Sequence, residues 1–76
     1  MISEKAREKS LAALTKRLQG FIDDGYWIIF YAADKYSYFV KLCHHNGNRV
    51  SLSLNLTNGD LSQFTNNKQV FSGKVC

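Results

Sequence analysis

Residues 26–56 read YWIIFYAADKYSYFVKLCHHNGNRVSLSLNL, and their hydrophobic pattern is that of an antiparallel β-sheet. Seven of the fourteen residues from Tyr26 to Phe39 are aromatic, a composition that favours strand. Further along the stretch, apolar and polar residues alternate with the period of two that a half-buried strand shows. The pattern therefore predicts three strands, at residues 26–33, 36–43 and 49–56.

The first hairpin is predicted from the turn residues Asp34 and Lys35. Paired residues of antiparallel strands share one face of the sheet, so the length of the turn determines which side chains meet. A two-residue turn pairs large apolar side chains with one another: Tyr31 with Tyr38, Ile29 with Val40, and Trp27 with Leu42. On this register, the expected core residues of the sheet include Trp27, Ile29, Tyr31, Val40 and Leu52.

The second hairpin is predicted to have a three-residue loop, His45-Asn46-Gly47. A two-residue turn would place apolar residues of one strand against serines of the next. The longer loop, with Gly47 in the left-handed conformation of a bulge, instead gives one continuous apolar face. Its pairs are Leu42 with Val50, Val40 with Leu52, and Tyr38 with Leu54.

A helix is predicted over residues 3–23, before the sheet. Its apolar side chains have the spacing of one helical face, at Leu11, Leu14, Leu18, Phe21 and Ile22. Ser3 is suited to the N-cap, and Gly25 follows where a helix should stop. The fold class is therefore α+β, with an N-terminal amphipathic helix packed on one face of a three- to four-stranded antiparallel β-meander.

The C-terminal third is less regular. Residues 57–60 have the composition of a turn, and the apolar residues beyond them are sparse. We expect a short edge strand after residue 61 and a frayed tail over residues 72–76, which has little to bury.

Length and composition limit the classes of function. A chain of 76 residues forms a single domain, residues 1–76. Ten lysines and arginines against six acidic residues give a net charge of +4, which favours acidic partners only mildly. The first residues lack the apolar core of a secretory signal, and no run of residues is long enough to span a bilayer. We therefore expect a cytoplasmic protein with Cys43 and Cys76 reduced.

Catalysis is not expected, because the titratable residues do not converge. Both glutamates lie in the first helical turns, and the two histidines are adjacent at a hairpin tip. The run Cys43-His44-His45 is the only cluster with metal-ligand chemistry, and neighbouring residues of a strand point to opposite faces. We expect no metal, no cofactor and no small-molecule substrate.

The outer face of the predicted sheet, away from the helix, indicates a protein-binding surface. Tyr26, Ile28 and Phe30 alternate outward on the first strand, with Phe39 opposite Phe30, whereas the third strand is polar outward. Such a face should be polar when only the other side is covered. The set Tyr26, Ile28, Phe30, Phe39, Lys41 and Arg49 has the composition of an interface.

This surface suggests a small non-enzymatic binding module that acts as an inhibitor or regulator, with a protein partner or a second copy of itself as the ligand. Its size and style are similar to those of the small regulators that phages and mobile elements encode. One alternative is that the fourth strand or the C-terminal tail folds over the apolar patch and makes it part of a thicker core.

The helix offers a second candidate surface. Lys5, Lys9 and Lys16 lie within a narrow arc opposite the leucines, with Arg17 on the flank. These side chains either form a solvated face or contact nucleic-acid phosphates. A nucleic-acid-binding protein is therefore the alternative function.

Overall fold

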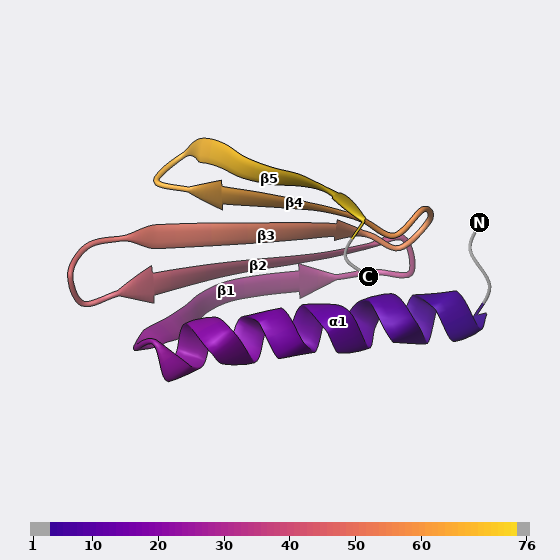
Figure 1. The fold of residues 1–76 in the computed structure, drawn as a ribbon, viewed down its shortest axis with the longest axis horizontal. Helices are drawn as coiled ribbons and strands as arrows, with labels where there is room; N and C mark the ends of the chain where they lie inside the picture. The colour runs from indigo at the N-terminus through magenta and orange to yellow at the C-terminus, as the bar shows by residue number, and fades with distance from the viewer. Residues whose placement is uncertain (1–3, 75–76) are drawn as a thin grey trace.

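The computed structural model describes residues 4–74, which form one helix followed by a five-stranded antiparallel sheet (Figure 1). The elements are α1 (Glu4–Asp23), β1 (Tyr26–Ala33), β2 (Ser37–His44), β3 (Arg49–Asn55), β4 (Asp60–Thr65) and β5 (Lys68–Lys74). Each strand pairs with the next in the chain, so the sheet is a meander with β1 and β5 at its edges. The predicted α+β class is confirmed, with five strands in place of three to four.

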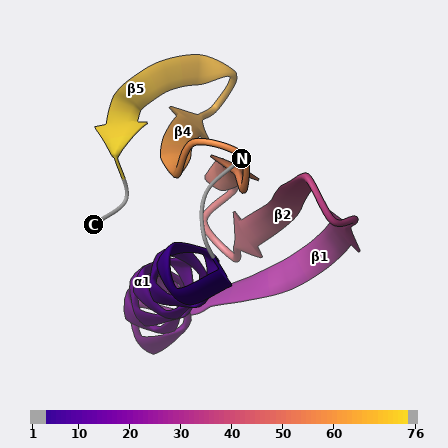
Figure 2. The same ribbon diagram turned by 90° about the vertical axis from the view of Figure 1, so that its right-hand side faces the viewer.

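The sheet is strongly curled, and α1 lies on its concave side (Figure 2). The predicted helix over residues 3–23 agrees with Glu4–Asp23, while the proposed N-cap Ser3 lies outside the described residues. Gly25 follows the helix with φ of +98°, a conformation that favours glycine. Within residues 4–74, α1 lacks the length of apolar sequence that crossing a membrane requires.

The hydrophobic core lies between α1 and the three central strands. Its buried members are Leu14, Leu18, Val40, Leu42, Val50, Leu52, Leu54, Leu56 and Leu61. Val40 and Leu52 are buried as predicted, but Trp27, Ile29 and Tyr31 are exposed, so the assignment of these three residues to the core is wrong. The exposure has two causes. A bulge in β1 turns Trp27 and Ile29 to the face away from α1, and Tyr31, on the inner face, lies on an edge strand that the single helix leaves exposed.

The β2–β3 hairpin has the predicted three-residue loop and the predicted register. Tyr38 pairs with Leu54, Val40 with Leu52, and Leu42 with Val50. Gly47 has φ of +95°, as the bulge position requires.

The β1–β2 hairpin differs from the prediction. Its strand pairs begin at Ala33–Tyr38, whereas a turn at Asp34 and Lys35 would pair Ala33 with Tyr36, so the connection between the strands is longer than predicted. Within it, the Asp34 amide donates to the Ser37 carbonyl. The Asp34 carboxylate accepts hydrogen bonds from the Tyr36 and Ser37 amides at 2.7 and 2.9 Å. This side chain organises the turn as an Asx motif does, so the predicted turn at Asp34 and Lys35 does not form.

A bulge at Ile29 then divides β1 into two halves. Phe30 pairs with Lys41 and Ile28 with Leu42, so Ile29 has no partner of its own. An extra residue in a strand reverses the faces of everything before it. The faces predicted for residues 26–29 are therefore reversed, whereas those predicted for residues 30–33 hold.

The C-terminal region is a full hairpin and not a frayed tail. Asn66 and Asn67 both have positive φ, 51° and 69°, in a two-residue turn between β4 and β5. Asparagine tolerates this conformation better than most residues. Residues 72–74 pair with β4, so the predicted fraying is wrong for them, while residues 75 and 76 lie outside the described chain.

Candidate protein-binding surface

Four large apolar side chains lie on the outer face of β1 and β2, the face away from α1. The register places Phe30 and Phe39 on the face of Lys41, and the bulge adds Trp27 and Ile29 to it. The rings of Phe30 and Phe39 meet edge to face, with centroids 6.2 Å apart. We define the outer patch as Trp27, Ile29, Phe30 and Phe39 with the flanking cations Lys41 and Arg49.

Exposure distinguishes this patch from core. Trp27 and Ile29 are each 48% exposed and Phe30 is 53% exposed, while Phe39 is half-buried between its neighbours. The alternative of a covering fourth strand or C-terminal tail does not apply to residues 60–74, because β4 pairs between β3 and β5, and β5 forms the opposite edge of the sheet.

Tyr26 and Ile28, predicted on the outer face, lie on the helix side. Tyr26 packs against the core, with its ring 5.4 Å from that of Phe21 and 4.9 Å from that of His44. Ile28 shares the face of its partner Leu42, which is fully buried. The reason is the bulge, which sequence periodicity did not reveal because every residue from 26 to 31 is apolar or aromatic.

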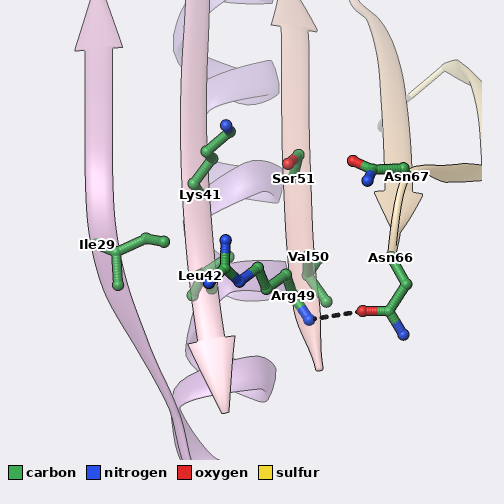
Figure 3. A pocket seen from close by; sticks show the side chains of 8 residues that line it. All are labelled: Ile29, Lys41, Leu42, Arg49, Val50, Ser51, Asn66 and Asn67. Atoms are coloured by element: carbon green, nitrogen blue, oxygen red, sulfur yellow. Dashed lines mark hydrogen bonds between the residues drawn. The ribbon is translucent and has the colours of Figure 1, made fainter. Parts of the chain in front are cut away.

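Lys41 and Arg49 lie beside the apolar side chains of the outer patch, where the sequence placed them, and line a pocket of about 230 Å³. Figure 3 views this pocket with α1 behind the sheet, and Ile29, Lys41 and Arg49 lie toward the viewer. The Arg49 amide donates to Asn66 Oδ1 at 3.0 Å, which fixes the β4–β5 turn beside the pocket. The sequence did not predict this pocket, because the turn at Asn66 was not anticipated.

Among the described residues, the cations beside the patch have no carboxylate partner. Within residues 4–74 the single ion pair joins Lys74 to Asp60, at 3.0 Å on the other edge of the sheet. Lys41 and Arg49 are both exposed. The patch therefore combines exposed apolar surface with uncompensated positive charge.

Of the four basic residues predicted to form a surface on the helix, only the three lysines project into solvent. Lys5, Lys9 and Lys16 are exposed, as a phosphate-binding or a solvated face would require. Arg17 instead turns toward the sheet, where it donates to Gln63 Oε1 at 2.9 Å and lies 4.7 Å from the centre of the Phe71 ring. Arg17 therefore belongs to the packing of α1 against the sheet.

The cluster Cys43-His44-His45 forms no metal site in the part of the chain that the structure describes. His44 is engaged at both ring nitrogens, with the Asp24 carbonyl at 3.0 Å from Nε2 and the Asn46 amide at 3.1 Å from Nδ1. These contacts connect the end of α1 to the β2–β3 loop, so the role of His44 is structural.

No protein-family model, curated protein or solved structure matches this chain, so its function is argued from geometry.

Proposed function

We propose that the protein is a small, non-enzymatic protein-binding module that acts through the outer patch. The observation that supports this proposal most strongly is that aromatic and branched apolar side chains cluster in water on a face that should be polar. Aromatic anchors surrounded by polar groups supply much of the binding energy at protein interfaces. Regulation or inhibition of the bound protein is the class of role that suits a chain of this size.

The charges of the patch favour a particular kind of partner. Lys41 and Arg49 project from neighbouring strands beside the aromatic cluster and lack carboxylate partners among the described residues. A protein that presents an apolar group next to acidic side chains would bury the first on Phe39 and pair the second with these cations.

Partner capture with matched variants tests this proposal. The immobilised chain should retain a specific protein from the cells that encode it, and Phe39→Ser should abolish retention, because loss of a central anchor costs about 2 kcal/mol or more. Val70→Ser is the control, since Val70 is 56% exposed on β5, away from the patch.

A charge variant keeps the test decisive if Phe39→Ser unfolds. Lys41→Glu combined with Arg49→Glu changes two exposed side chains and leaves the apolar contacts intact. The proposal would be contradicted if this charge variant and a folded Phe39→Ser both retained the partner as well as the wild type does.

Nucleic-acid binding is the second candidate, and the observation that favours it is the exposure of Lys5, Lys9 and Lys16. Replacing the three with Ala should remove any gel shift seen at low salt, and wild-type binding should fall steeply as salt rises. Arg17→Ala is not informative here, because it would disturb the packing against Phe71. Absence of any shift at low salt would eliminate this candidate.

A further inference from the structure

The two edges of the sheet differ in how they are protected. β5 begins at Lys68 and ends at Lys74, and it contains a bulge and Gly73. Charged residues, bulges and irregular strands are the usual means by which proteins prevent an edge from pairing with another chain. β1 has a bulge but carries neither charge nor proline from Tyr26 to Ala33.

β1 is also exposed along almost its whole length. Every residue from Trp27 to Ala33 is exposed, on both faces of the sheet. In Figure 2, no other element lies beyond β1 at its end of the sheet. A strand of eight residues, roughly 26 Å long at about 3.3 Å per residue, thus presents its free edge and apolar side chains to water.

We infer that β1 pairs antiparallel with β1 of a second copy of this chain. The pairing joins two five-stranded sheets into one continuous sheet about a two-fold axis that passes between Ile29 and Phe30. Strand addition of this kind supplies main-chain hydrogen bonds to both edges.

The bulge makes the face pattern of β1 symmetric, which is the first argument for a second copy. Its residues lie in the order inner, outer, inner, outer before the centre and outer, inner, outer, inner after it. When the two β1 strands pair antiparallel with their ends aligned, a flush register, every inner-facing residue therefore meets an inner-facing residue and every outer-facing residue meets an outer-facing one. The pairs are Tyr26 with Ala33, Trp27 with Ala32, Ile28 with Tyr31, and Ile29 with Phe30.

The charges at the ends of β1 supply the second argument. Asp24 precedes β1 by two residues and Lys35 follows it by two, so the same register brings the end of α1 of one copy close to the β1–β2 turn of the second copy. The two-fold axis repeats this approach of opposite charges at both ends of the seam. Asp24 and Lys35 are both exposed, and neither forms an ion pair within residues 4–74. The strand is uncharged between them, so no like charges meet along the seam.

The arrangement has a consequence for the outer patch. A two-fold axis perpendicular to the sheet keeps both outer faces on the same side, so Ile29 and Phe30 of the two copies meet and the two patches become one surface. The pairing of two copies does not depend on the proposed function. The further statement that a partner binds the joined patches rests on the proposed function.

Sedimentation velocity over a range of concentrations tests the pairing. The wild type is expected to dimerise with rising concentration, and Tyr31→Lys is expected to stay monomeric, because it places a charge on the exposed edge. Gln69→Lys, on the exposed β5 edge, is the matched control and should dimerise like the wild type. A wild type that stays monomeric, or a folded Tyr31→Lys that still dimerises, would overturn the inference.

Charge exchange tests the register. Lys35→Glu and Asp24→Lys should each raise the dimer Kd several-fold, and combining them should restore it, because the exchanged pair is again complementary. Asp24→Lys places a cation at the end of α1, where the helix dipole favours it, so the fold is preserved. Additive losses in the double variant would show that these residues do not meet.

Dimerisation and partner binding can be tested independently of one another. Phe39 lies on β2, away from the seam, so Phe39→Ser should lose partner retention and still dimerise. Tyr31 lies on the inner face, so Tyr31→Lys should lose the dimer and keep each single outer patch. A monomeric wild type that retains its partner would overturn the pairing alone.

Discussion

Gly47 and Gly59 both have positive φ but differ in their surroundings, and this difference determines how much an added Cβ would destabilise the fold. Gly47 has φ of +95° in the β2–β3 loop, and a Cβ there would have no neighbour within 4 Å. Gly59 has φ of +79°, and a Cβ there would lie 3.4 Å from the hydroxyl of Ser10. Ser10 is buried at 3% exposure, so the turn before β4 packs against the first half of α1.

Gly47→Ala should lower the free energy of unfolding by about 1 kcal/mol, because alanine is strained at positive φ while the space around it is open. Denaturant unfolding measures this change, with Gly20→Ala as the control in a helix where nothing lies near the added Cβ. An unchanged stability of Gly47→Ala would contradict the bulge conformation of this loop.

Gly59→Ala should cost more than Gly47→Ala, since the added methyl group is strained by its φ and also approaches the buried Ser10. The same unfolding experiment gives the comparison. Equal losses in the two variants would show that the turn does not pack closely against α1.

At the scale of the elements, β1 and β3 show what the sequence can and cannot determine. In β3, serines alternate with Val50, Leu52 and Leu54, so only one register keeps the apolar side chains together. The β2–β3 hairpin could therefore be predicted in full. In β1 every residue is apolar or aromatic, so several registers look equally favourable and periodicity could not locate the bulge at Ile29.

The same reasoning explains the candidate site. Phe30, Phe39, Lys41 and Arg49 were predicted on the outer face because their register is set by β2 and β3. Trp27 and Ile29 were missed because they precede or form the bulge. The β4–β5 hairpin was missed because its turn is Asn66-Asn67, which lacks the glycine that usually marks such turns.

The turn between β1 and β2 should be sensitive to acid. The amides of Tyr36 and Ser37 donate to Asp34 and hold the pKa of its carboxyl group below the ordinary value of 3.8. A lowered folded-state pKa means that the contribution to stability is present above about pH 3.8 and is lost as the pH falls through the folded-state value.

Asp34→Asn isolates this contribution, because its amide oxygen accepts the same hydrogen bonds and does not titrate. The stability difference between wild type and Asp34→Asn, measured by unfolding at several pH values, should be constant near neutrality and shift against the wild type below about pH 3.8. A difference that is independent of pH would contradict the role of the Asp34 carboxylate.

At the scale of the whole molecule, a single helix covers the middle of a five-stranded sheet and leaves β1 and the outer face of β2 exposed. Among residues 4–74 the core contains nine buried side chains, and no residue of β1 is one of them. A strand that contributes so little to the core and displays so many aromatic side chains is the basis of the proposal that β1 takes part in an interaction surface.

Trp27 is the single tryptophan of the chain and lies in the outer patch, so its fluorescence reports directly on this claim. In the dilute folded protein, its emission should be that of a partly exposed indole, and acrylamide should quench it. With rising concentration the quenching should decrease, while Tyr31→Lys should remain fully quenchable. A Trp27 that resists quenching at every dilution at which the fold is intact would show that β1 is covered within the monomer, and would contradict the account.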